Sequence, residues 1–530
     1  MDFSSPPRGS VWPLRLAVIG VASFFAAPFA YLAVRSFGEG PGLLETVTSA
    51  DSLASLGRSV LLGTSVALSA TVLGTAAAWL VARTDLPGRR WWLVVLPLPL
   101  VIPSYIGAFV LLAAFARGGL VYEMLQVFGP EVNAFRGFTG SFIVLTLFTY
   151  PYVYLPAHAR LRQLPPSLEE SARLLGTGPW RSFFSIVLPQ ARSAIMAGSL
   201  LVFLYTISEF GVVQLMRYDT LPRVIYSTRL LDALTSVRLS LMLGLLAVLV
   251  VMSERVVSRA LQVTSAARSP RPLQIRLGRW KPLAGVFMSA LIGFALIAPI
   301  GVLLWWTVRD PGRASTIGTD LSDLVQPALN TSIASVGAAL LAVLLVAPVA
   351  YLTVHRPGRF AGLANAVVVG GFALPGLAIA LSLVYLTVGA PGPLGRIYQT
   401  LPLLVFAYVI HFGAQAMRAG QIAVASVPAG VDDAARTLGV GRWGRLLRIE
   451  LPLMLPGLLA GAGLVLLSSM KELPATLLLA PTGFQTLSVK IWNGTESALF
   501  ADASLASLLL IATSGILTWA LVIRRSVKLV

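Results

Sequence analysis

Apolar runs long enough to cross a lipid bilayer recur along the whole chain, and they restrict its fold more than any other feature. A helix rises 1.5 Å per residue, so about 20 mostly apolar residues span the hydrocarbon core. Because a lipid-exposed backbone must satisfy its own hydrogen bonds, such runs are expected to fold as helices. The candidates lie at about 15–34, 59–81, 92–115, 138–158, 193–216, 239–257, 283–308, 329–354, 360–388, 401–417, 454–480 and 503–523. The sequence therefore predicts an all-α polytopic membrane protein with about 12 transmembrane helices.

Composition supports this class of protein and excludes a soluble globular domain. Hydrophobic residues make up 56% of the chain and charged residues only 12%, against roughly 25% charged in soluble domains. The net charge of +18 is compatible with nucleic-acid binding. However, the basic residues lie in short loops between apolar runs, as is typical of membrane orientation signals. With a cytoplasmic N-terminus most of them fall on the cytoplasmic side, so both termini are predicted to be cytoplasmic. The first apolar run exceeds the roughly 7–15-residue core of a signal peptide, which predicts a retained first span.

One polar stretch occurs twice. Shifting Leu168–Pro189 by 263 residues places it on Val431–Pro452 without gaps, and seven residue types recur in that register. They include the glycines Gly176 and Gly439 and the closing Leu-Pro pair. The second candidate span of each half also ends in Pro-Gly-Arg, at 87–89 and 357–359. The chain is therefore predicted to consist of two related halves.

The predicted domains follow this duplication. Residues 1–257 form the first six-span half, the basic, proline-containing segment 258–282 a cytoplasmic linker, and residues 283–530 the second half. An even number of spans separates equivalent points, so the two halves have the same orientation. This arrangement predicts a pseudo-twofold axis along the membrane normal, with a substrate path where the halves meet.

The repeated stretch predicts a short polar helix between two spans. Ser167 and Glu170 fit a capping box, and Gly176 supplies the left-handed residue that ends the helix. The second copy has Ala429 or Gly430 at the cap position, so its start is less well specified. A single copy would be explained by a solvated or interfacial helix. Two copies at matched topology instead indicate docking to a symmetric cytoplasmic dimer.

At this point the chain resembles a known family. The pattern Glu/Asp-x-Ala-x3-Gly, with Leu-Pro further on, is the loop motif of permeases in binding-protein-dependent ABC importers. It stands here at Glu170–Gly176 and Asp433–Gly439, with Ser171 where the family usually has alanine. The resemblance covers essentially the whole chain and implies the fold of type I ABC importer permeases. It also implies that each loop inserts a coupling helix into an ATP-hydrolysing subunit.

The resemblance further implies the partners and the residues that meet them. It implies a non-catalytic permease in the bacterial inner membrane, with two cytoplasmic ATP-binding subunits, an extracytoplasmic substrate-binding protein and no nucleic-acid partner. No cofactor is expected in this chain, because ATP-Mg would bind the partner subunits, and no G-x4-G-K-[ST] phosphate loop occurs. The implied ATPase-coupling residues are Glu169, Glu170, Ala172, Arg173, Gly176, Asp432, Asp433, Ala435, Arg436 and Gly439.

Within that superfamily, the cargo is indicated by the fused architecture and by one segment of the second half. The segment Met470–Leu479, MKELPATLLL, is similar to that of ferric-iron permeases. Permeases for thiamine and for aminoethylphosphonate share the fused plan and remain alternatives. A more distant alternative is a secondary transporter driven by an ion gradient, although it would need no docking loops. A lipid-modifying membrane enzyme would need clustered acids or histidines, and only isolated ones occur.

Two acidic residues share the repeat register and are candidates for a translocation path or gate. Glu209 and Glu472 both lie 20 residues beyond the Leu-Pro pair, about 30 Å along an unbroken helix. That length places them towards the outer side unless the helix is broken. Ionisable residues within spans are functional candidates, and carboxylates suit hard cations. Alternatively, both side chains reach the outer interface, or Glu472 pairs with Lys471. The sequence predicts no metal site.

Overall fold

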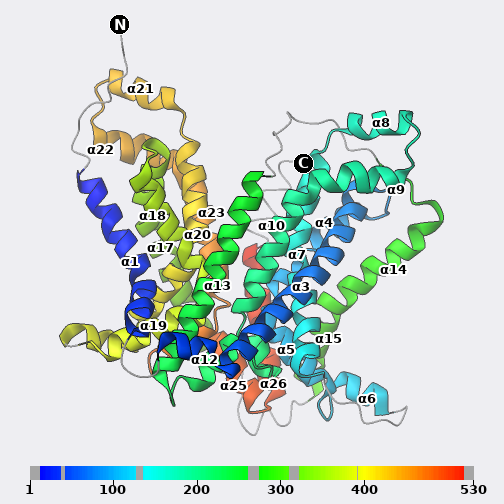
Figure 1. Cartoon of the computed structure of the whole chain (residues 1–530), viewed down its shortest axis with the longest axis horizontal. Coiled ribbons are helices and arrows are strands. Elements are labelled where there is room, and N and C mark those ends of the chain that lie inside the picture. The colour runs from blue at the N-terminus through cyan, green and yellow to red at the C-terminus, as the bar shows by residue number, and fades with distance from the viewer. Residues whose placement is uncertain are drawn as a thin grey trace. The chain divides into compact units, whose positions relative to one another are not determined.

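Helices form all the regular structure in the part of the chain that the computed structural model describes, apart from one isolated β-bridge (Figure 1). The structure describes residues 12–37, 42–126, 135–260, 274–309, 322–390 and 392–518. Within these ranges, 11 helices are long and apolar enough to cross a membrane. The predicted all-α, polytopic fold is confirmed. These helices are Trp12–Ser36, Ala50–Arg83, Ser104–Leu125, Gly137–Gln163, Phe183–Ser208, Ala233–Ser253, Gly278–Val308, Ser322–His355, Leu401–Ala425, Leu446–Ser469 and Phe500–Leu517.

The continuous span predicted at 360–388 is wrong. Two shorter helices replace it, α18 (Arg359–Gly370) and α19 (Gly376–Val388), with a 3-10 turn at Gly371–Ala373 between them. Leu374 is extended, with ψ of 130°, because the ring of the following Pro375 disfavours the helical conformation. Proline also lacks the N–H that a continuing helix would need.

The predicted span at 92–115 is broken in the same way. It consists of α4 (Arg89–Val95), a 3-10 turn η1 (Leu98–Val101) and α5 (Ser104–Phe115). Ile102, which precedes Pro103, is extended with ψ of 120°. By contrast, Pro151 lies inside the continuous helix α7. Prolines therefore end some of these helices and are accommodated within others.

The described chain divides into two compact units, and each contains segments from both halves of the sequence. Unit 1 comprises Met1–Glu39, Leu324–Val489 and Ile516–Val530, and unit 2 comprises Gly40–Asp323 and Lys490–Gly515. The first span therefore belongs with the second half of the sequence, and the span after the linker belongs with the first half. The sequence boundaries at 257 and 283 mark the repeat rather than the packing. Residues 261–273 of the predicted linker lie outside the described residues.

Unit 2 is built on three closely packed helices, α3, α7 and α10. Gly74 of α3 brings its backbone against the Tyr150 carbonyl of α7, where a Cβ would come within 2.7 Å. Gly198 of α10 approaches the same helix at Tyr152, and a Cβ there would also come within 2.7 Å of the Tyr152 carbonyl oxygen. Small residues allow close helix contact in membranes. The helices of unit 2 before the linker are α2 (Leu43–Thr48), α3 (Ala50–Arg83), α4, η1, α5, α6 (Leu120–Gln126), α7 (Gly137–Gln163), α8 (Pro166–Leu174), α9 (Pro179–Ser182), η2 (Phe183–Val187), α10 (Leu188–Ser208), α11 (Gly211–Leu215), α12 (Leu221–Thr228) and α13 (Ala233–Ala260).

The helical segment that begins in the last residues of the predicted linker packs against α5 in the same unit. It consists of η3 (Gly278–Trp280), α14 (Lys281–Ile292), a π-helical turn η4 (Gly293–Ile297) and α15 (Ala298–Arg309). Two neighbouring indoles fix it, because Trp305 Nε1 donates to the Gly118 carbonyl at 3.0 Å and Trp306 Nε1 to the Ala113 carbonyl at 3.1 Å. The helix α26 (Phe500–Thr518) adds Phe500, whose ring lies 5.1 Å from that of Trp306.

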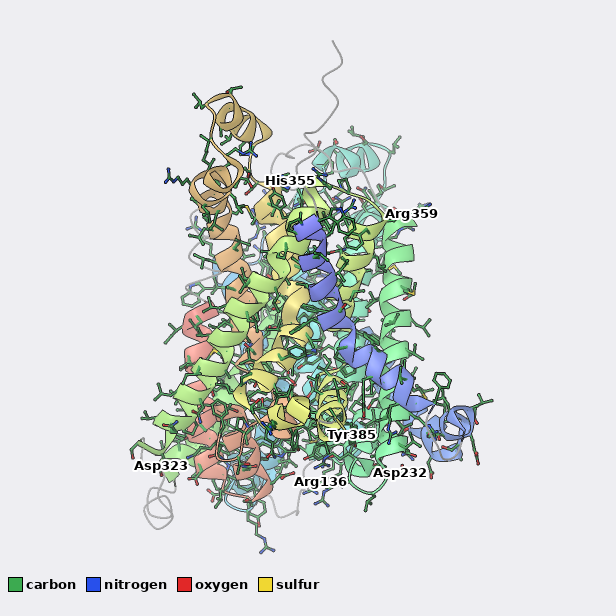
Figure 2. The ribbon with its side chains drawn as sticks, turned by 90° about the vertical axis from the view of Figure 1, so that its left-hand side faces the viewer. Arg136, Asp232, Asp323, His355, Arg359 and Tyr385 are labelled. Atoms are coloured by element: carbon green, nitrogen blue, oxygen red, sulfur yellow. The ribbon has the colours of Figure 1, made fainter. Side chains whose placement is uncertain are left out.

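Unit 1 has a related core, formed by α20 and α23. The first helix α1 packs on α18 and α19, and the fully buried Phe25 lies beside Gly371 and Gly413. Figure 2 shows His355 and Arg359 at one end of this unit and Tyr385 towards the other. The elements of unit 1 are α1 (Trp12–Ser36), α17 (Ser322–His355), α18, η5 (Gly371–Ala373), α19, η6 (Gly392–Ile397), α20 (Leu401–Ala425), α21 (Ala429–Thr437), α22 (Arg442–Arg445), η7 (Leu446–Glu450), α23 (Leu451–Ser469) and α24 (Pro474–Leu479). Helix α25 (Leu487–Glu496) runs from unit 1 into unit 2.

Candidate functional site: two loop helices and two acidic helix breaks

The duplicated stretch folds into the same local structure in both copies. Helices α8 (Pro166–Leu174) and α21 (Ala429–Thr437) have nine residues each and begin and end at positions 263 residues apart. In Figure 1, α8 extends beyond one end of unit 2, opposite α6 and α12, and α21 lies at one end of unit 1. The sequence register is therefore also a structural register.

A left-handed glycine ends each of these helices. Gly176 has φ of 82° and Gly439 has φ of 75°, a conformation that residues with a Cβ rarely adopt. A Cβ at either position would meet nothing within 4 Å, so the requirement for glycine comes from the backbone alone. The predicted left-handed role of Gly176 is confirmed.

The predicted capping box at Ser167 is wrong. Helix α8 begins at Pro166, which places Ser167 inside the first turn instead of at the cap. Proline is well suited to a first helical position, because its fixed φ is helical and the N–H it lacks would be unpaired there. In the second copy the helix begins at Ala429, so both candidate cap residues, Ala429 and Gly430, also lie inside the first turn, and that cap prediction is wrong as well.

The segment after each glycine is repeated as well. Short helices α9 and α22 lead into five-residue π-helical turns, Phe183–Val187 and Leu446–Glu450, and the spans α10 and α23 start at the following leucine. π-Helical turns are rare and are found mostly inside longer helices at functional sites. Their recurrence in one register indicates that the join between the loop and the span is part of the repeated design.

The described side chains of α8 and α21, and of the residue that follows each helix, divide into outward and inward groups. Leu174, Leu175 and Leu438 are 89%, 84% and 81% exposed, which leaves apolar surface uncovered by the chain itself. Glu170 is also exposed, whereas Glu169 and Ala435 are buried. The side chains of Ala172, Arg173, Asp432, Asp433 and Arg436 lie outside the described residues.

Glu169 points into its own unit. Its carboxylate forms an ion pair with the guanidinium of Arg83 at the end of α3, and the two side chains are only 3% and 1% exposed. Sequence reasoning missed Arg83, because 86 residues separate the two partners and nothing local marks the contact.

Helix α10 runs unbroken from the Leu-Pro pair to the residue before Glu209, and α23 ends three residues before Glu472, so the breaks lie at the acids themselves. Helix α10 ends at Ser208 and Glu209 is extended, with ψ of 123°. Its Oε1 accepts a hydrogen bond from the Val212 N–H at 3.2 Å, at the start of α11. Glu472 repeats this geometry and accepts from the Ala475 N–H at 3.2 Å, at the start of α24. Each carboxylate therefore caps the short helix that follows the break.

The surroundings of the two acids differ. The hydroxyl groups of Ser104 and Tyr205 hydrogen bond to Glu209 and to each other. Around Glu472, Gly376 occupies the position of Ser104 and Ser468 the position of Tyr205. Ser468 does not replace the tyrosine contact, because its hydroxyl hydrogen bonds with Gln415 at 2.9 Å.

Gly376 makes room for the Glu472 carboxylate. A Cβ at this glycine would come within 2.6 Å of Glu472 Oε1. The imidazole of His411 lies near the same carboxylate, with Nε2 4.0 Å from Oε2. Glu472 thus lies beside an imidazole and the backbone of a glycine, whereas Glu209 lies beside two hydroxyl groups. Among the described residues there is no group of three or more histidines or acids placed to hold a metal ion.

A membrane protein with this duplicated loop and broken-span architecture has the form of a transport permease, and comparison with known sequences gives its family. The profile of the binding-protein-dependent transport system inner membrane component family matches residues 70–263 and 344–529. The chain belongs to this family. Both matched regions contain one copy of the loop helix and one acidic break.

Individual relatives transport different substrates. The Fe(3+)-transport system permease protein FbpB 2 of Haemophilus influenzae is 29% identical over 519 residues, which is 96% of this chain and 98% of that protein. The molybdenum transport permease ModB of Escherichia coli is 33% identical over 138 residues, and the sulfate transport permease CysT of the same organism is 31% identical over 142 residues. These two alignments cover 26% and 27% of this chain, and 60% and 50% of the respective relatives.

Proposed function

We propose that this permease imports ferric iron. The supporting observation is the alignment with the ferric-iron permease, which extends over 96% of this chain and 98% of that protein. The molybdenum and sulfate permeases align with only about a quarter of the chain. The fused two-half plan is thus shared along its full length with a relative whose name gives ferric iron as cargo. Permeases for thiamine or aminoethylphosphonate are the alternatives that the fused plan leaves open.

Transport is driven in this proposal by two separate ATP-binding subunits that bind ATP-Mg, and a substrate-binding protein delivers the cargo from outside. The chain lies in the bacterial inner membrane with both termini in the cytoplasm. Helices α8 and α21 then face the cytoplasm and act as coupling helices. Their uncovered leucines, Leu174, Leu175 and Leu438, give apolar contact area for the ATPases. The coupling residues proposed from the motif are Glu169, Glu170, Ala172, Arg173, Gly176, Asp432, Asp433, Ala435, Arg436 and Gly439.

Glu209 and Glu472 are proposed to act in the translocation path or gate. The support is their position at breaks of two membrane-spanning helices, where irregular backbone is tolerated only next to protein or water. Broken spans also form the substrate sites of many transporters. In this role the carboxylates hold the breaks in shape and present negative charge to a cation.

The coupling role can be tested with two glycine pairs. Gly176→Leu and Gly439→Leu force a side chain onto a left-handed backbone, because both glycines have positive φ. Gly178→Leu and Gly441→Leu are the matched controls, because these glycines do not have positive φ. A Cβ at any of the four would meet nothing within 4 Å. We expect the first double variant to insert normally and to lose co-purification of the ATPase. The second double variant should retain it. Equal retention of the ATPase by both would contradict the coupling assignment.

The cargo can be tested by uptake of radioactive ferric iron into cells that express the complete transporter. We expect uptake to stop when the ATPase is inactivated and to persist when the membrane potential is dissipated. Unlabelled thiamine or aminoethylphosphonate should not compete. Competition by either compound would identify that cargo instead, and loss of uptake on dissipation alone would favour an ion-gradient-driven transporter.

A further inference from the structure

The end of α3 next to the loop helix α8 is fully hydrogen bonded. A helix leaves its last four carbonyls without partners inside the helix, and here each finds one. The Thr84 hydroxyl donates to the Leu80 carbonyl, and Arg89 donates to the carbonyls of Val81 and Ala82 at 2.9 and 3.2 Å. The Ile275 N–H, from the later part of the predicted linker, donates to the Arg83 carbonyl at 2.8 Å.

The same segment holds the next residues of the chain. Thr84 and Ile275 form a parallel bridge, and the Asp85 N–H donates to the Ile275 carbonyl at 3.2 Å. The Asp85 carboxylate accepts from the Leu277 N–H at 2.9 Å and lies 2.7 Å from Lys281 Nζ. The backbone is therefore held by hydrogen bonds both before Arg83, at the end of α3, and after it, at Thr84 and Asp85.

From this fixed backbone the Arg83 side chain reaches Glu169 on α8. Both side chains are almost completely buried, and a buried charge that loses its partner is strongly unfavourable. An ion pair of this kind therefore resists separation of the two helices. On its other faces, α3 packs closely with α7 and α10.

The second half has no cation at the position that matches Arg83, and the basic residues of that helix end, His355 and Arg356, are exposed. There Thr353 occupies the place of Arg83 in the Pro-Gly-Arg register. Its hydroxyl accepts a hydrogen bond from Gln421 Nε2 of α20 at 3.1 Å. This side chain thus contacts a span of unit 1, whereas Arg83 contacts a loop helix.

We propose that Arg83 is a positioning residue for the first coupling helix. Its ion pair with Glu169 fixes α8 to the end of α3, so that displacement of α8 by a bound ATPase moves α3, α7 and α10 together. Glu169 then contributes to coupling through its own bundle and not by contact with the ATPase. The coupling part of this inference rests on the proposed function, whereas the attachment of α8 does not.

The attachment can be measured in the full-length chain, which contains no cysteine. Leu174→Cys, on α8, and Leu438→Cys, one residue beyond α21, introduce single exposed sites for a nitroxide spin label. We expect Arg83→Met and Glu169→Gln each to raise the mobile fraction of the label at 174 and to leave the label at 438 unchanged. The double variant Arg83→Met with Glu169→Gln should raise the mobile fraction of the label at 174 no further than the single variant with the larger effect, since both changes remove the same contact.

Two further variants distinguish positioning from general loosening. Arg89→Met removes hydrogen bonds at the same helix end without touching Glu169, and it should leave the label at 174 unchanged. Reversing the pair, with Arg83→Glu and Glu169→Arg together, should restore the immobile spectrum. If Arg83→Met fails to insert, Glu169→Gln, which changes a residue outside the spans, carries the same test.

The inference is overturned if the label at 174 stays immobile in Glu169→Gln, or if the labels at 174 and 438 respond equally. ATPase retention is then measured on the same samples, where we expect a fall of about tenfold or more in Arg83→Met. Mobility that rises while ATPase retention is unchanged would preserve the attachment of α8 and contradict its coupling function.

Discussion

Glu209 and Glu472 show how one backbone position can be used in two chemical settings. Both carboxylates cap the helix after a break. One is surrounded by hydroxyl groups and the other by a glycine and His411. The shared part is therefore structural, and the two halves differ in the groups that surround the carboxylate.

Substitutions at Glu472 should separate the capping role from the charge. Glu472→Gln keeps an acceptor for the Ala475 N–H, so we expect the melting temperature to stay close to that of the wild type and ferric-iron uptake to fall. Glu472→Ala removes the acceptor and should cost about 0.5–2 kcal/mol of stability as well. Thermal unfolding in detergent and uptake in cells are the two measurements. Full uptake by the glutamine variant would show that the charge is not used.

Asp85 provides a pH prediction at the residue scale. The Leu277 N–H, followed by the ammonium group of Lys281, lowers the pKa of this carboxyl below its ordinary value. A lowered pKa in the folded state adds stability at pH values above the unfolded value of about 3.9, and this is lost as the pH falls through the folded pKa. Attachment of the segment 274–281 should therefore be constant between pH 6 and pH 8.

The measurement is hydrogen exchange of the peptide 274–281, corrected for intrinsic rates. Asp85→Asn should exchange faster than the wild type by the same factor at pH 6 and pH 8. Peptides from α21 serve as an unaffected reference. A protection in the wild type that changes across this range would show that a group other than Asp85 controls the contact.

Local geometry at single residues was predictable, and long-range pairing was not. The left-handed Gly176 followed from its place after a short amphipathic run, because the helix terminator is a local signal. The ion pair of Glu169 with Arg83 was not foreseen, since one sequence carries no information about which distant charges meet. Ser167 fitted a local capping pattern, but Pro166 competes for the first position of the helix and displaces it.

At the element scale, the duplicated segment was predicted better than the spans. The loop helices follow from amphipathic pattern and glycine, and their bounds repeat at the sequence offset. The spans at 92–115 and 360–388 were predicted as continuous because hydropathy does not register backbone breaks. Proline was a usable signal in both, but Pro151 inside α7 shows that it does not decide the outcome alone.

Packing of α1 in unit 1 depends on a glycine in α20. A Cβ at Gly413 would come within 2.5 Å of the Phe25 ring, whereas a Cβ at Gly337 of α17 meets only Val405 at 3.6 Å, an ordinary contact. We expect Gly413→Ala to lower the melting temperature and Gly337→Ala to leave it unchanged or raise it slightly, because alanine favours helix. Overpacking of this kind costs about 1–3 kcal/mol.

The combination of Phe25→Leu with Gly413→Ala is the control for this contact. The smaller side chain frees space beside the new methyl group, so part of the lost stability should return. Thermal unfolding of the purified chain reports each value. Equal melting temperatures for Gly413→Ala and Gly337→Ala would show that α1 does not pack tightly at this point.

At the scale of the whole molecule, the order of repeats and the order of packing disagree. The sequence divides near residue 257 because the repeat does, yet α1 packs in the unit formed mainly by the second half, and α14 and α15 pack in the other unit. Hydropathy and repeats indicate how many spans there are and which are equivalent. They do not indicate which bundle each span joins, because an apolar run marks a span without marking its neighbours.

This exchange of helices predicts that an unbroken linker is not needed for assembly. Co-expressed fragments 1–265 and 266–530 should co-purify, because the first fragment supplies α1 to unit 1 and the second supplies α15 to unit 2. The buried Phe25 makes the contact of α1. The indoles of Trp305 and Trp306 make the contact of α15, because they donate to the carbonyls of Gly118 and Ala113. Affinity purification through a tag on one fragment, followed by size-exclusion chromatography in detergent, reports the association.

Removing the exchanged helix tests the reason for this association. Fragment 38–265, which lacks α1, should retain less of its partner than fragment 1–265, and Phe25→Ala in the longer fragment should give an intermediate loss. Only the contacts of α1 within unit 1 differ among these three samples. If all three retain the partner equally, association rests on contacts other than the exchanged first helix.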